Sequence, residues 1–119
     1  MRVAHAVTIV LLVAAFGCSS GTGPGGGAGG RTQSPAMRST AFSPTPDTVA
    51  AGVAVTWTNN DGIVHTVTSA PGSADVFSSG NVAASGTFSH TFNTPGTYSY
   101  YCTIHGTPTS GMRGTIVVQ

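Results

Sequence analysis

The sequence predicts an all-β fold, a Greek-key β-sandwich of about seven or eight short strands, for residues 37–119. Short runs with a two-residue alternation of apolar and polar side chains dominate this part of the chain, and no stretch has the 3.6-residue period of a helix. Clusters of Gly, Pro, Asn and Asp separate the runs at intervals of about eight to twelve residues, which is typical of two packed sheets.

The alternating runs are the expected strands. In residues 53–58 the alternation is strict and places Val53, Val55 and Trp57 on one buried face. Phe88 and Phe92 are expected to face inward from a later run. Residues 70–84, rich in Pro, Gly, Ser and Asn, are expected to form a long irregular connection. In chain order, we expect strands at residues 39–42, 47–50, 53–58, 64–69, 87–92, 98–101 and 115–118.

Charged residues are scarce, and this excludes several functions. The chain has four Arg or Lys and three Asp or Glu, and all seven are Arg or Asp. No basic strip is present, so we expect no nucleic-acid partner. Three scattered Asp do not provide paired carboxylates for acid–base chemistry, so the chain is not expected to be a hydrolytic enzyme.

The N-terminus is expected to be a targeting segment. Residues 1–18 combine a basic Arg2, an apolar stretch too short to span a bilayer, and small residues around Cys18. This resembles a bacterial lipoprotein signal, in which Cys18 would be acylated; ordinary signal-peptidase cleavage is the alternative. We therefore expect an exported protein of the periplasm or cell envelope, whose one membrane contact is a lipid anchor at Cys18.

Residues 19–36 are expected to be a flexible tether. Seven of the ten residues from Gly21 to Gly30 are Gly, and no apolar periodicity is available to offset the cost of ordering this backbone. A phosphate-binding Gly-rich loop is excluded, because no strand precedes the stretch and no helix follows it. The folded domain is therefore expected to occupy residues 37–119.

Four side chains form a candidate metal site. Cys102, His105 and Met112 are expected on one short loop between two strands, and His65 lies at the start of a strand far upstream. Two strands that converge on a loop fix its ends, so these donors can be held at one point. One thiolate, two imidazoles and a thioether are the donor set of a trigonal copper centre with a long axial bond.

Other interpretations of these residues remain open at this point. Singly, His65 could be a hydrogen-bonding turn histidine and His105 a solvated loop residue. Met112 could be core filler, and Cys102 could be a buried apolar residue or a disulfide partner of Cys18. A Cys–His nucleophile would need an orienting Asn or Asp and an oxyanion hole, for which no pattern is present. A structural zinc site would need paired ligand spacing such as C-x₂-C, which is absent.

Three runs carry a resemblance to a known family. They read V-T-W-T-N-N-D-G-I-V-H-T-V, G-T-F-S-H-T-F-N-T-P-G-T-Y-S-Y-Y-C-T-I-H and G-M-R-G-T-I-V-V. Together they resemble the plastocyanin-like branch of the cupredoxins over nearly all of residues 42–118. The resemblance implies one type 1 (blue) copper ion with His65, Cys102, His105 and Met112 as ligands. Six residues separate His105 from Met112, a longer spacing than in the compact loops common in the family.

The resemblance also implies a function. A protein of this kind carries single electrons by cycling between Cu(II) and Cu(I), as a monomer that docks its redox partners transiently around His105. The alternative is a copper-holding or copper-delivery protein of the cell envelope; a copper enzyme would need a second cluster of His. His90 is expected to pack among aromatic rings rather than to bind copper. Thr66 is expected to hydrogen-bond between the two ligand loops.

Overall fold

A computed structural model describes residues 34–119. The expected signal peptide, the expected acylation site at Cys18 and the tether as far as residue 33 lie outside the described residues, so they stay predictions. Among residues 34–119, no helix has the length and the apolar character needed to cross a membrane.

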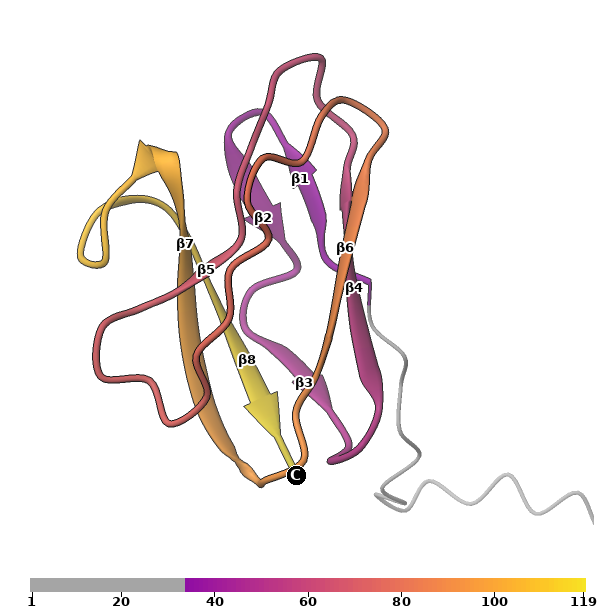
Figure 1. Cartoon of the computed structure of the whole chain (residues 1–119), viewed down its shortest axis with the longest axis vertical. Helices are drawn as coiled ribbons and strands as arrows, with labels where there is room; N and C mark the ends of the chain where they lie inside the picture. Colours follow the sequence, from indigo (N-terminus) through magenta and orange to yellow (C-terminus); the bar gives the residue numbers. More distant parts are fainter. Residues whose placement is uncertain (1–33) are drawn as a thin grey trace, which may run out of the picture.

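The described residues form a sandwich of two four-stranded sheets, which confirms the predicted fold class (Figure 1). One sheet has the strand order β2-β1-β4-β6 and the other β3-β8-β7-β5. The β1–β4 and β3–β8 pairs are parallel, whereas the other neighbours are antiparallel. The strands are β1 (Ala36–Arg38), β2 (Ala41–Ser43), β3 (Asp47–Val49), β4 (Ala54–Asn59), β5 (Thr68–Ser69), β6 (Thr87–Thr91), β7 (Gly96–Gly106) and β8 (Gly111–Val118).

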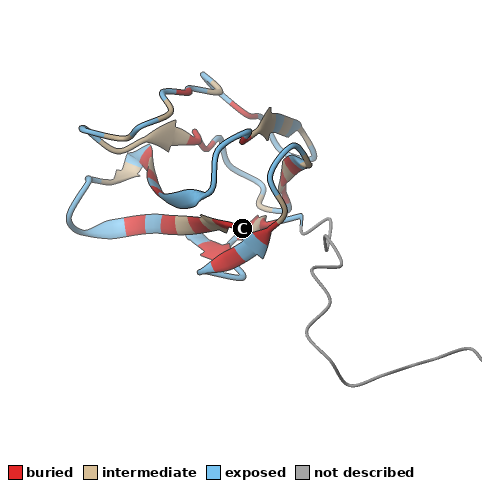
Figure 2. Cartoon of the chain, turned by 90° about the horizontal axis from the view of Figure 1, so that it is seen from below, coloured by how far each residue is buried: buried red, intermediate tan, exposed pale blue. Residues whose placement is uncertain are grey.

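The core lies between the sheets and is rich in aromatic rings. Buried and exposed residues alternate along the strands (Figure 2), as expected where one face of each sheet is packed and the other is solvated. Trp57 is fully buried at the centre of this core, 5.4 Å from the ring of Tyr100 and 6.1 Å from that of Phe77. Phe92 is also fully buried, while Phe88 is partly exposed at the edge of the core.

The prediction of one extended run at residues 39–42 was wrong. Ser39 and Thr40 form the turn of a hairpin between β1 and β2, with left-handed φ angles of 52° and 55°. Both backbone N–H groups donate to the carboxylate of Asp61, at 2.7 and 3.1 Å. A side chain 21 residues downstream therefore stabilises a backbone conformation that non-glycine residues seldom adopt.

The prediction of a strand over residues 64–69 was wrong for most of its length. Only Thr68 and Ser69 pair with β7, as β5. The preceding N–H groups donate to side chains instead, that of Thr66 to Cys102 Sγ and that of Val67 to Ser79 Oγ. Because those donors are already used, no continuous ladder forms, and His65 makes only an isolated bridge with Val82.

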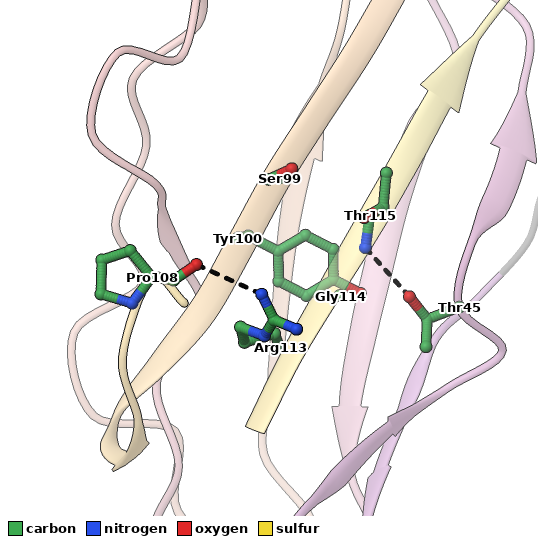
Figure 3. A pocket seen from close by; sticks show the side chains of 7 residues that line it. All are labelled: Thr45, Ser99, Tyr100, Pro108, Arg113, Gly114 and Thr115. Carbon is green, nitrogen blue, oxygen red and sulfur yellow. Dashed lines mark hydrogen bonds between the residues drawn. The ribbon is translucent and has the colours of Figure 1, made fainter. Parts of the chain in front are cut away.

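Tyr100 lies directly across from Gly114 in the β7–β8 pairing. Figure 3 shows its ring reaching from β7 to Gly114, beside a pocket lined by Thr45, Ser99, Tyr100, Pro108, Arg113, Gly114 and Thr115. A Cβ atom added at Gly114 would lie 2.3 Å from Cζ and Oη of Tyr100. The movement of the ring is limited, because it also packs edge-on against Phe42 and Trp57.

Gly114→Ala should therefore destabilise the protein by about 1–3 kcal/mol, the usual cost of overfilling a packed core. Denaturant unfolding of the metal-free protein measures this change. Gly62→Ala is the matched control, since no atom lies within 4 Å of a Cβ added there and its φ is not left-handed; its unfolding free energy should stay within about 1 kcal/mol of the parent. Equal stability of the two variants would contradict this account of the core.

Candidate metal centre

An irregularity in the β7–β8 ladder holds three of the four expected donors. Tyr101 pairs with Arg113 and Gly106 pairs with Gly111, with a register shift between the two pairs. Residues 102–105 of β7 therefore lie opposite the single residue Met112 of β8. A bulge of this kind re-aims side chains while the ladder on either side fixes its ends.

The expected boundaries of this region were therefore wrong. The predicted strands stopped at residue 101 and resumed at residue 115, with the donors on a loop between them. In the structure β7 continues to Gly106, β8 begins at Gly111, and only residues 107–110 form the turn between them. The Thr107 N–H closes that turn on the Ser110 carbonyl at 2.8 Å.

Two glycines allow the strands to come together beyond the bulge. A Cβ atom at Gly106 would lie 2.7 Å from the backbone N and O of Met112. One at Gly111, where φ is +75°, would lie 2.7 Å from the His105 carbonyl oxygen. Only glycine fits such close approaches, so these two positions hold the backbones of His105 and Met112 next to each other.

His65 reaches the bulge from the segment between β4 and β5. Its backbone N–H donates to the Val82 carbonyl at 3.1 Å, and its carbonyl accepts the Val82 N–H at 2.8 Å. These two bonds fix the position of the His65 backbone. Its side chain is fully buried, as is that of Cys102, while His105 is half-buried.

The ring nitrogens and the sulfur converge. Nδ1 of His65 lies 3.1 Å from Nδ1 of His105, and the sulfur of Cys102 lies 3.8 Å from the first and 3.7 Å from the second. A point equidistant from the three atoms is about 2.1 Å from each, inside the roughly 2.0–2.3 Å range of bonds from a first-row metal such as zinc to imidazole nitrogen and thiolate sulfur. The three side chains therefore fit one metal ion.

The environment of Cys102 favours the thiolate. Burial acts to raise the pKa of this thiol, but hydrogen bonds to the sulfur, first among them that from the Thr66 N–H, outweigh it and lower the pKa from 9.0 to about 6. The Thr66 N–H lies 3.3 Å from the sulfur. Most of the thiol is thus ionised at neutral pH, which is the form that binds metals.

Thr66 joins the two ligand segments, as the sequence predicted. Its hydroxyl oxygen accepts the Thr103 N–H at 2.8 Å and lies 3.0 Å from the Thr103 hydroxyl. With the contact to Cys102 Sγ, the residue after His65 makes three hydrogen bonds to the bulge. These bonds set the separation of His65 from Cys102.

Asp61 is a part of the site for which the sequence analysis proposed no role. Its Oδ2 lies 2.7 Å from Nε2 of His65. A carboxylate oxygen only accepts, so this contact places the ring proton on Nε2 and leaves the Nδ1 lone pair for a metal. The signal in the sequence was weak: one acidic residue four positions before a candidate ligand.

Two further residues were singled out from the sequence, and the ligand role of Met112 stays a prediction. Met112 is buried in β8 opposite the bulge. His90 lies apart from the cluster, stacked on Phe77 at 4.8 Å between ring centroids, with Nε2 3.0 Å from Asp75. The pocket of Figure 3 contains none of the three converging donors.

Fold and site together define a β-sandwich protein with a buried Cys-and-two-His metal centre. Residues 31–119 match the family of copper binding proteins described as the plastocyanin/azurin family. The chain belongs to this family, and its cofactor is one copper ion.

Known proteins with similar sequences and structures agree. Amicyanin-alpha of Methylorubrum extorquens is 40% identical over 73 residues, which are 60% of this chain and 58% of that relative, so the match spans little more than half of its length. Plastocyanin of Scenedesmus fuscus is 36% identical over 86 residues, 66% of this chain and 86% of the relative. A purple cupredoxin from Nitrosopumilus maritimus superposes with a TM-score of 0.62 at 27% identity, over 72% of this chain and 98% of that one.

The same fold also occurs within an enzyme. A copper-containing nitrite reductase from Thermus scotoductus superposes with a TM-score of 0.65, over 75% of this chain and 22% of the enzyme. At 22% identity this likeness concerns the fold alone.

Proposed function

We propose that this protein carries single electrons between redox partners, using one copper ion held by His65, Cys102 and His105 with Met112 as the axial ligand. The observation that carries the proposal is the convergence of the three donor atoms within 3.1–3.8 Å of one another. Soft thiolate and thioether donors favour Cu(I), while imidazoles suit both oxidation states. A mixed donor set therefore allows both states to share one geometry.

The copper ion supplies the one-electron couple, and the chain's contribution is to keep the donors still. Hydrogen bonds hold His65 at its backbone and at Nε2, and the ladder holds both ends of the bulge. Donors that are already in place need little movement when the charge changes. His65 and Cys102 are buried, so most of the donor set is shielded from solvent and from a substrate, which supports a carrier rather than an enzyme.

Redox partners would dock around His105, the half-buried ligand. Its neighbour Ile104 is 50% exposed, and Ile63, two residues before His65, is 48% exposed. No charged residue lies among residues 102–112, so contacts there would be apolar, transient and little steered by charge. We further infer a monomer that is exported and attached to a membrane through a lipid on Cys18; this inference rests on residues 1–18.

The proposed role is tested by electron exchange and copper release in the same preparation. An electron carrier should interconvert its Cu(I) and Cu(II) forms rapidly, seen as line broadening in NMR spectra of mixed samples, and should hold copper against a chelator. Slow exchange together with ready release of copper to the chelator would instead favour a copper-holding or copper-delivery protein on the same fold.

Met112→Leu tests the axial ligand. Loss of a thioether that binds along the axis should raise the reduction potential while the intense blue colour stays, because the axial donor tunes the potential and the thiolate gives the colour. We expect a rise on the order of 60 mV, a tenfold change in the one-electron equilibrium. Voltammetry of both proteins gives the shift, and an unchanged potential would remove Met112 from the copper site.

A further inference from the structure

We propose that Asp61 is a positioning residue which couples the copper ligand His65 to the β1–β2 hairpin, so that the state of the copper and the order of the hairpin depend on each other. The inference rests on the proposed function only in taking His65 as a ligand. It assigns to the N-terminal hairpin, residues 36–43, a part in the metal centre that it does not touch directly.

The Asp61 carboxylate has three donors from two separate parts of the fold. Oδ1 accepts the Ser39 N–H at 2.7 Å, while Oδ2 accepts the Thr40 N–H at 3.1 Å and the His65 Nε2–H at 2.7 Å. One side chain thereby connects the turn of the hairpin with the ring that presents Nδ1 to the metal.

The carboxylate is itself fixed in place. The Asp61 N–H donates to Oδ1 of Asn59 at 2.9 Å. Asn59 is fully buried, and its Nδ2 donates to the carbonyls of Ile63 and Val82. A carboxyl group that accepts hydrogen bonds from three N–H donors is held as the carboxylate, so the group that faces His65 carries a negative charge.

The hairpin depends on the same carboxylate. Ser39 and Thr40 both have left-handed φ angles, and a turn of non-glycine residues in this conformation is costly. β1 also pairs with β4, whose end leads into Asp61, through Met37 opposite Asn59. Figure 1 shows the hairpin turn and the end of β7 that carries the bulge at the same end of the sandwich, away from the C-terminus.

Two consequences follow for the copper. A carboxylate that accepts Nε2–H makes the imidazole a stronger donor at Nδ1 and fixes the orientation of the ring. Its negative charge favours Cu(II) over Cu(I), which lowers the reduction potential. By reciprocity, copper on Nδ1 strengthens the Nε2–H bond to Asp61 and, through it, the order of Ser39 and Thr40.

Asp61→Asn tests the effect on the copper, because it removes the charge and keeps the size. Loss of such an outer partner typically weakens metal binding by about 10- to 100-fold. We expect Cu(II) affinity to fall about tenfold more than Cu(I) affinity, which raises the reduction potential by about 59 mV. Voltammetry and competition titrations with a chelator measure the two quantities.

Asp75→Asn is the matched control. Asp75 pairs with His90 at 3.0 Å in the same way but makes no contact with a candidate ligand. Asp75→Asn removes the same negative charge as Asp61→Asn, but away from the copper ligands, so it should leave the reduction potential unchanged. Equal potentials for the parent, Asp61→Asn and Asp75→Asn would overturn the proposal. If the parent itself lacks the blue spectrum or rapid exchange, the proposed function fails instead.

Hydrogen exchange on the unmodified chain tests the coupling without relying on a variant that could fail to fold. Copper loading should slow exchange of the Ser39 and Thr40 amides several-fold. The amide of Gly52, which donates to the Phe92 carbonyl, is the internal reference and should not change. Identical exchange of Ser39 and Thr40 with and without copper would show that hairpin and metal centre are independent, against the proposal.

Discussion

The register shift between β7 and β8 is the constraint on which the metal centre depends. Four residues on one strand face one residue on the other, and regular pairing resumes on both sides. The ladder therefore fixes the ends of a segment that is too long to stay extended, and Cys102 and His105 turn toward the interior. Gly106 and Gly111 allow the strands to close again beyond it. The site is built from backbone pairing as much as from donor side chains.

The second half of the site comes from a segment that pairs poorly with the sheets. Between β4 and β5 the Thr66 N–H donates to a sulfur and the Val67 N–H to a hydroxyl, while His65 forms only an isolated bridge with Val82. Of these, the Thr66 N–H bonds to Cys102, so a donor that a strand would use joins the segment of His65 to the bulge instead. The loss of regular structure and the convergence of the donors thus have one physical origin. A rigid cluster of this kind suits electron transfer, since little movement accompanies a change of charge.

The sequence alone was sufficient for the fold class and for the three donors that converge, His65, Cys102 and His105, because alternating apolar residues and the chemistry of Cys and His are local properties. Met112 as a fourth donor stays a prediction. Strand limits near the site were not predictable. Pairing continues through the bulge to Gly106 and resumes at Gly111, so the loop that the Pro, Thr and Ser content indicates is confined to residues 107–110. Side-chain acceptors break pairing where residues 64–69 indicate a strand. Asp61 was missed for a related reason: two of its three partners lie on a hairpin about twenty residues away.

The central claim is that Cys102, His65 and His105 bind one copper ion through the atoms that converge in the structure. The most direct measurement is the visible and EPR spectrum of the copper-loaded protein, beside Cys102→Ser as a control. The account predicts an intense blue band with narrow copper hyperfine splitting, both absent from the control, as for a thiolate in a trigonal site. A pale spectrum of ordinary Cu(II), the same in both proteins, would contradict it and would remove Cys102 from the copper site.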